Sequence, residues 1–154
     1  MRLLSLSAAL LLGVAILRAG EPTQAQQAEL EKYTGTWEAV YVEHQGKALP
    51  PNEVRAIKLL VAGEKYTVKI GKMKIEGTHQ LDPSARPKRI DAVRSKDPSP
   101  EKTLKGIYEL GPDSFKVCYG AAGKERPTQF STREGGQRLL AFRREKLPPE
   151  KKEP

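Results

Sequence analysis

From residue 35 to residue 146, short runs of alternating hydrophobic and polar residues follow one another, which is typical of half-buried β-strands. The clearest run spans 65–70, where tyrosine, valine and isoleucine alternate with lysine and threonine. Prolines fall between the runs, where they interrupt no ladder of hydrogen bonds. The runs expected to form strands are 37–44, 56–61, 65–70, 73–81, 88–93, 103–110, 115–119, 128–132 and 137–144.

Most of these runs are linked by short segments with turn composition, such as Gln45-Gly46 and Gly71-Lys72. Strands joined in this way form an antiparallel meander, and closing a meander removes its exposed edges. The sequence therefore predicts an all-β fold, a single antiparallel up-and-down β-barrel of eight or nine strands over residues 35–146. A lead-in over 26–34 has a helical pattern, and one helical turn is expected from Pro51.

Both ends of the chain differ in composition from the barrel region. Arg2 is followed by an apolar run over 3–17, and about fifteen residues suit a signal peptide better than a membrane-spanning helix. Small residues place the cleavage after Ala25, which we prefer, or after Ala19. The prediction is a signal peptide over 1–25 and a periplasmic or extracellular protein without a stable membrane span after cleavage; the alternative is an uncleaved anchor. The polar tail 147–154 is expected to be disordered.

Charge and cysteine content narrow the partners and the means of stabilisation. The formal charge of +8 becomes +7 when residues 1–25 are removed, and the excess lysine and arginine are spread along the chain. Such a surface either keeps the protein in solution or contacts an envelope protein or an anionic envelope polymer. Nucleic acid is not expected, because no basic run is interleaved with aromatic residues. Cys118 is the single cysteine, so no intrachain disulfide can form.

Candidate chemistry is sparse along the chain. No nucleophile elbow or phosphate-binding loop occurs, and the only two histidines, His44 and His79, lie in different strands. We therefore expect no enzyme activity, no cofactor and no metal site. Cys118 is expected to be a small buried residue, with an intermolecular disulfide as the alternative. The glycine-rich loop 120–127 offers Lys124 and Arg126 to an anion, or is a flexible connection.

Strand alternation indicates which side chains face the barrel interior. An eight-stranded barrel is either filled by its side chains or holds one small ligand, and both readings are open here. If Trp37 points inward, the candidate ligand-binding residues on the inner face are Tyr41, Tyr66, His79, Tyr108 and Tyr119. His79 is the most informative of them, because an imidazole among apolar neighbours needs a hydrogen-bond partner or supplies one to a ligand.

Two motifs at opposite ends of the barrel region carry a family resemblance. With Gly35-Thr36-Trp37 at its start and Arg143-Arg144 at its end, the chain resembles the lipocalin-like ligand-binding barrels. More narrowly, it is similar to exported lipocalin-like domains of unknown function that are abundant in planctomycete-type bacteria. The segments that carry this resemblance are 35–38, 46–47, 65–67, 76–78, 81–83, 87–88, 90–91, 106–110, 116–119 and 123–128.

The resemblance implies a structural role for the two motifs. Trp37 would close one end of the barrel, and Arg143 or Arg144 would cover its indole ring. The Thr-Asp-Tyr segment and the disulfide of larger lipocalins are missing, so their ligand-binding habits carry over by analogy alone. The expected function is non-catalytic binding of a small apolar or amphipathic molecule. The alternative is an interaction module with a filled barrel and basic loops that contact protein or an anionic envelope polymer.

Overall fold

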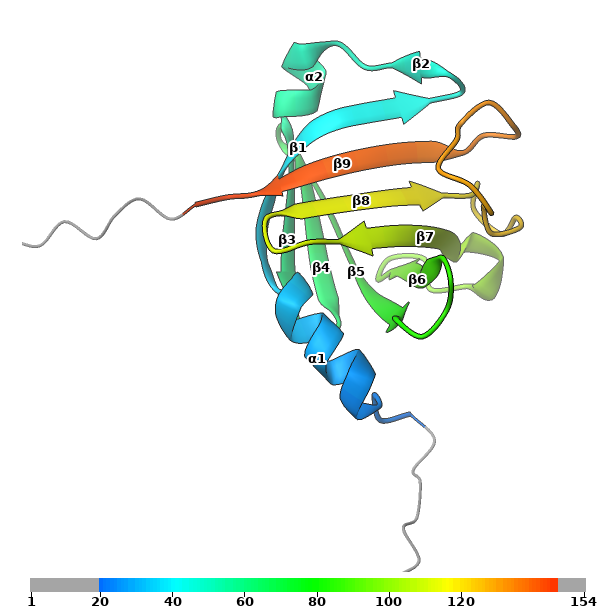
Figure 1. Cartoon of the computed structure of the whole chain (residues 1–154). Helices are drawn as coiled ribbons and strands as arrows, with labels where there is room; N and C mark the ends of the chain where they lie inside the picture. The colour runs from blue at the N-terminus through cyan, green and yellow to red at the C-terminus, as the bar shows by residue number, and fades with distance from the viewer. Residues whose placement is uncertain (1–19, 147–154) are drawn as a thin grey trace, which may run out of the picture.

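A computed structural model describes residues 20–146 (Figure 1). Residues 1–19 of the predicted signal peptide and the predicted tail 147–154 therefore lie outside the described residues. One helix, α1 (Gln24–Tyr33), precedes the strands, and a one-turn helix, α2 (Pro51–Arg55), follows the second of them. The strands are β1 (Gly35–His44), β2 (Lys47–Ala48), β3 (Ile57–Ala62), β4 (Lys65–Ile70), β5 (Met73–Asp82), β6 (Lys88–Arg94), β7 (Leu104–Leu110), β8 (Ser114–Tyr119) and β9 (Arg138–Arg144), with a 3-10 turn, η1 (Pro100–Lys102), before β7.

The sheet closes into a barrel because β1 pairs with two neighbours. Its first residues pair with β3, and the stretch from Trp37 to His44 pairs with β9. All pairings are antiparallel and the remaining strands follow chain order, with β2 as an extra strand on β1. Eight strands therefore form a closed up-and-down barrel, which confirms the predicted fold class. Within the described residues no helix is long and apolar enough to cross a membrane.

One predicted strand is absent from the structure. The segment 128–132 was expected to be a strand, but it is irregular, and β9 pairs directly with β8. The reason lies in side chains that hold the long β8–β9 connection against the barrel: Arg126 donates to the carbonyl oxygens of Ile90 and Gly106, and Thr132 accepts from the Gly46 amide. The helical turn expected at Pro51 is present as α2.

Tyr41 lies outside the barrel, so its prediction as an inner-face residue is wrong. The register between β1 and β9 shifts between Ala39 and Tyr41, which is a β-bulge at Val40. An extra residue on one strand reverses the alternation beyond it. Val40 and Tyr41 are therefore exposed, and Val42 takes the inner position. The Tyr41 hydroxyl donates instead to the Glu43 carboxylate on the outer surface.

Helix α1 lies across the barrel end at which β1 begins (Figure 1). It begins with a capping box: the Thr23 hydroxyl accepts from the Gln26 amide, and the Gln26 side chain accepts from the Thr23 amide. The Gln26 side chain also donates to the Leu81 carbonyl oxygen at 2.9 Å, which ties the first turn to β5. Leu30 and Tyr33, three residues apart on one face, are buried in the barrel core.

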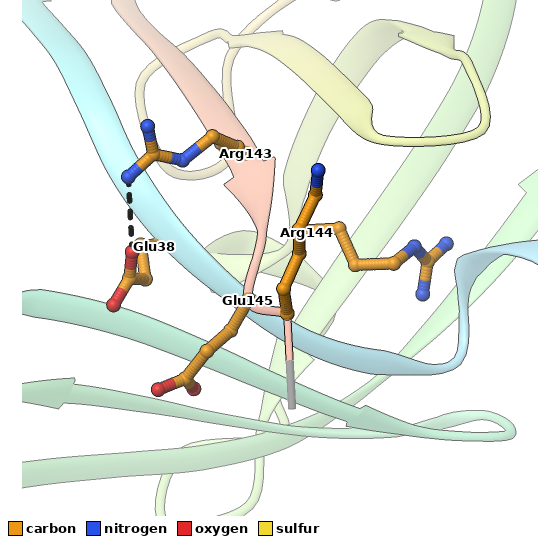
Figure 2. Close-up of a pocket in the computed structure, with 5 residues that line it drawn as sticks. Glu38, Arg143, Arg144 and Glu145 are labelled. Atoms are coloured by element: carbon orange, nitrogen blue, oxygen red, sulfur yellow. Dashed lines mark hydrogen bonds and ion pairs between the residues drawn. The ribbon is translucent and has the colours of Figure 1, made fainter. Parts of the chain in front are cut away.

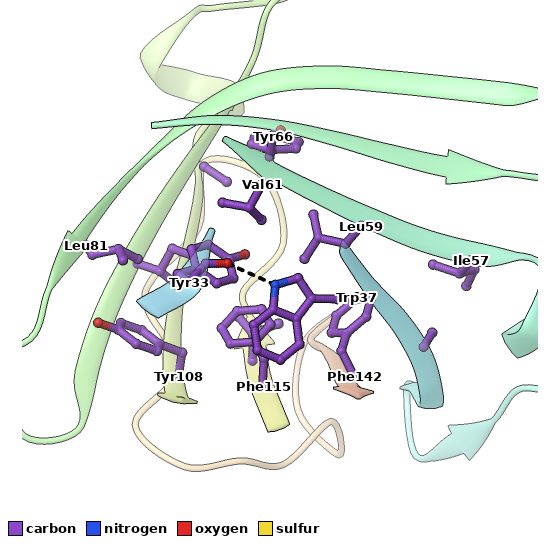
Figure 3. Close-up of a cluster of buried hydrophobic side chains, with 14 of the residues drawn as sticks. Tyr33, Trp37, Ile57, Leu59, Val61, Tyr66, Leu81, Tyr108, Phe115 and Phe142 are labelled. Carbon is purple, nitrogen blue, oxygen red and sulfur yellow. Dashed lines mark hydrogen bonds between the residues drawn. The ribbon is translucent and has the colours of Figure 1, made fainter. Parts of the chain in front are cut away.

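The core at the α1 end of the barrel consists of packed aromatic rings (Figure 3). Tyr33 enters from the helix, and its ring centroid lies 4.6 Å from that of Phe115 and 6.3 Å from that of Trp37. Phe115 stacks on Phe142 at 5.8 Å and contacts Tyr108 at 6.1 Å. Offset and tilted rings at these distances attract one another beyond the gain from burial. This end of the barrel is therefore filled by side chains.

Cys118 is buried in a small cluster on the outer side of β8. It pairs across strands with Ile107, which is also buried, and neither belongs to the main core. The irregular segment after β8 covers it, since the thiol donates to the Ser131 carbonyl oxygen at 3.5 Å. Burial raises the pKa of the Cys118 thiol, so the thiolate is disfavoured.

Candidate functional site

Arg144 makes the contact across the Trp37 indole. Its guanidinium carbon lies 4.1 Å from the ring centroid, and the indole is fully buried and donates to the Tyr33 carbonyl oxygen at 2.9 Å. The guanidinium also donates to the carbonyl oxygens of Lys32 and Thr34 at the end of α1. A cation is favourable at a helix C-terminus, so one side chain joins the helix end, the indole and the last strand.

Gly35 is required for this arrangement. Its φ is 142°, and a Cβ at this position would lie 2.6 Å from Nη1 of Arg144. A side chain at residue 35 would therefore displace the guanidinium from the helix end. The Gly35-Thr36-Trp37 motif thus provides the space for Arg144 as well as the buried ring.

Arg143 is not the residue that lies over the indole; it lines an open hollow of about 400 Å³ at the end of β9 (Figure 2). Its guanidinium pairs with Glu38 at 3.3 Å, and Lys58 pairs with both Glu38 and Glu145. Both carboxylates at this hollow are thus already paired within the protein, and the hollow is open to solvent. We therefore assign it no ligand.

Tyr108 faces the interior, but its hydroxyl is already occupied. It donates to the buried Glu29 carboxylate of α1 at 3.0 Å, and the Lys88 ammonium lies 2.7 Å from the same oxygen. Burial, followed by the Glu29 charge, raises the pKa of Tyr108. A buried carboxylate with these two donors fixes α1 onto the barrel and leaves Tyr108 unavailable to a ligand.

Tyr66 and Tyr119 lie on the inner face over glycines of the neighbouring strands. A Cβ at Gly77 would lie 2.6 Å from the Tyr66 hydroxyl, and one at Gly106 would lie 2.8 Å from the Tyr119 ring. These glycines are the cross-strand partners of the two tyrosines. Glycine at these positions lets each ring lie flat against the sheet.

Three phenol groups of the interior have no protein partner within residues 20–146. Burial raises the pKa of Tyr33, and the nearby phenols of Tyr119 and Tyr66 add to the rise. Burial also raises the pKa of Tyr66 and that of Tyr119, and no hydrogen bond contributes to any of these shifts. The three phenols therefore add polar groups to an aromatic interior, but within the described residues none of their oxygens is both buried and unpartnered.

His79 differs from these phenols, because its free polar atom is buried. The residue is 2% exposed on the inner face of β5, its ring stacks on Tyr66 at 5.6 Å, and the Tyr33 ring lies 4.9 Å away. Its Nε2 atom is buried and has no hydrogen-bond partner among the described residues. Burial lowers the pKa of His79 to about 4, so the imidazole is neutral at neutral pH.

Four of the five residues predicted for the ligand site are therefore on the inner face, and Tyr41 is not. The loop 120–127 does not present Arg126 to an anion, because this guanidinium pairs with Asp91 at 2.7 Å and with two backbone carbonyls. Sequence reasoning missed Tyr33 and Glu29 as interior residues. The spacing of Glu29, Leu30 and Tyr33 on one face of the lead-in helix was the available signal.

The fold and this site define a class: a closed eight-stranded antiparallel barrel, capped by a helix, with an aromatic interior that holds one buried imidazole nitrogen without a partner among the described residues. Among the described residues no three His, Cys, Asp or Glu side chains are grouped as metal ligands. Comparison with family models, curated proteins and solved structures finds no match to this chain. Its function is therefore argued from its own residues.

Proposed function

We propose that this protein is an exported, non-catalytic barrel that binds a small apolar or amphipathic molecule in its interior. The observation that carries the proposal is the buried Nε2 of His79, which lacks a hydrogen-bond partner among the described residues and lies against the rings of Tyr33 and Tyr66. The Trp37–Arg144 contact also supports membership of the lipocalin-like class, since it is the contact that the resemblance implies.

A buried polar atom without a partner costs about 1–3 kcal/mol, and native proteins contain few of them. Here that atom is Nε2 of His79, and the phenol rings of Tyr33 and Tyr66 pack beside it. A mostly apolar pocket with a few polar groups is the usual form of a small-molecule site. A bound molecule or ordered water that donates to this nitrogen would recover the cost.

The alternative function, an interaction module, is favoured by two other features. Aromatic rings fill the α1 end of the barrel, and the bulge exposes Val40 and Tyr41 side by side on the outer surface, where they are 52% and 38% exposed. With a formal charge of +8 in the full sequence, the surface also suits an acidic partner. On this alternative the barrel would be empty of ligand, and the outer surface would contact an envelope protein or an anionic polymer.

Native mass spectrometry of the exported protein, purified without detergent or heat, separates the two functions. We expect a fraction of the protein to carry a small additional mass that is released on unfolding. After removal of this compound the protein should bind an apolar fluorescent probe, and the released compound should displace the probe. A protein that is consistently empty and takes up no apolar probe contradicts ligand binding and favours the interaction module.

Export carries its own prediction, which concerns the cleavage position. The capping box that begins α1 uses Thr23, and Gly20, Glu21 and Pro22 line a hollow against β5. Cleavage after Ala25 would remove all of them, and loss of an N-cap alone costs about 1 kcal/mol. We therefore propose cleavage after Ala19 and expect the intact mass of the exported protein to begin at Gly20. A mature chain beginning at Gln26, or one that retains Met1, contradicts this prediction.

A further inference from the structure

A small hollow lies between the beginning of α1 and the end of β5. Its volume is about 140 Å³, and His79 is among the residues that line it. The other lining residues are Gly20, Glu21, Pro22, Gln26, Leu30, Glu64, Gln80 and Leu81. Since a water molecule occupies about 30 Å³ in the liquid, the hollow has room for a polar head group and a few methylene groups.

The free nitrogen of His79 is a hydrogen-bond acceptor. A hydrogen bond to the Gly63 backbone partly offsets the fall in the His79 pKa. Because Nε2 has no partner, we assign this bond to Nδ1, which then carries the proton. A neutral imidazole that donates through Nδ1 presents only a lone pair at Nε2. The group that completes it must therefore bring an N–H or O–H donor.

The charges around the hollow also favour a donor over an anion. Glu21 and Glu64 line it, and no lysine or arginine does. This local acidity contrasts with the +8 formal charge of the full sequence. Both carboxylates are exposed, so their effect is screened by salt, but they repel an anion and favour a donor that is neutral or positively charged. A carboxylate head group would meet a lone pair and two like charges.

We propose that this hollow is the polar end of the ligand site and that it selects a head group with a hydrogen-bond donor, an alcohol or an amine, through Nε2 of His79. The inference rests on the proposed function and specifies the ligand class. The donor is the chemistry shared by the two head groups, and the experiment distinguishes them.

Four probes of matched chain length test the proposal on the exported protein by calorimetric titration at pH 7.5. They are n-hexanol and n-hexylamine, which donate, methyl pentyl ether, which is neutral and only accepts, and hexanoate, which is an anion and only accepts. We expect hexanol or hexylamine to bind at least about tenfold more tightly than the ether and hexanoate, which corresponds to about 1.4 kcal/mol. The stronger of the two donors identifies the head group.

The variant His79→Phe keeps an aromatic ring but removes the acceptor. We expect this variant to reduce the preference for donor probes over acceptor probes to less than about threefold, because the specific hydrogen bond to Nε2 is lost. Gln80→Ala, which alters an exposed residue lining the same hollow, should keep the preference. If His79→Phe fails to fold, the wild-type protein still decides the matter through the ¹⁵N resonances of its two histidines. A donor probe should shift the Nε2 signal of His79 and leave that of His44 unchanged.

The outcomes separate this inference from the proposed function. If all four probes bind equally, or if His79→Phe keeps the preference for donors, the head-group inference is overturned while binding in the interior stands. Binding of hexanoate alone also overturns it. If none of the probes binds and native mass spectrometry finds an empty barrel, the proposed function itself fails.

Discussion

Replacing Trp37 with alanine should lower the free energy of unfolding by about 3–5 kcal/mol, as truncations of large core side chains do. The indole is fully buried, with an exposure of 0%, and it contacts the rings of Tyr33 and Phe115. Truncation also removes the donor to the Tyr33 carbonyl oxygen and the surface beneath Arg144. Urea denaturation followed by circular dichroism measures the change.

Val40→Ala is the matched control on the same strand. Val40 sits at the bulge with half of its surface exposed, so its truncation should change the free energy of unfolding by less than about 0.5 kcal/mol. Trp37→Phe retains a ring and should cost less than Trp37→Ala, which keeps the comparison measurable if the alanine variant does not fold. A loss below about 1 kcal/mol for Trp37→Ala would show that the indole does not hold the barrel end together.

The second large effect is a loss of stability in mild acid caused by His79. Its pKa is about 4 in the folded protein and about 6.5 in the unfolded chain. Between these values the unfolded chain binds a proton that the folded protein does not, so stability falls as the pH falls. The loss begins near pH 6.5 and is complete near pH 4, and the difference in pKa corresponds to about 3 kcal/mol.

The groups packed against His79 do not stabilise its protonated form. The phenol rings of Tyr33 and Tyr66 pack against the imidazole, and neither carries a negative charge at this pH. The acidic residues that line the same hollow are Glu21, before α1, and Glu64, on the turn between β3 and β4, and both are exposed. A protonated imidazole would therefore place a positive charge inside an aromatic cluster, so burial is the main cause of the lowered His79 pKa.

Urea denaturation at pH 7 and at pH 4 measures this effect. Other groups titrate in the same range, including Asp82, whose pKa is lowered by its hydrogen bond from Ser84, so the difference between variants is the relevant quantity. Wild type should lose about 3 kcal/mol more than His79→Phe between the two pH values. His44→Gln, which changes the other histidine, should behave as wild type. Equal losses in wild type and His79→Phe contradict the buried, neutral imidazole.

The alternation of residue types was sufficient to predict most of the barrel. Where a strand is half-buried, as β4 and β5 are, apolar positions recur every second residue and need no knowledge of the partner strand. The bulge at Val40 is different, because it depends on how β1 meets β9 about a hundred residues later in the chain. Because the bulge reverses the alternation, Tyr41 was predicted on the inner face but lies on the outer one.

The candidate site was predictable in part for the same reason. The inner positions of Tyr66, His79, Tyr108 and Tyr119 follow from strand alternation, but their availability does not. Tyr108 is occupied by Glu29, a residue 79 positions earlier in the chain. Arg126 is likewise held by Asp91 and by two backbone carbonyls. Such pairings between distant residues leave no periodic trace in the sequence.

The sequence by itself determined the strand pattern, the order of the meander and the two motifs that meet at Trp37, because these depend on local propensity and on short-range periodicity. Only the tertiary structure decided which arginine covers the indole, how α1 enters the barrel and that the buried Nε2 of His79 lacks a partner among the described residues. Those outcomes depend on side chains brought together by barrel closure. Closure is a long-range event whose geometry is set by register and bulges that single residues do not reveal.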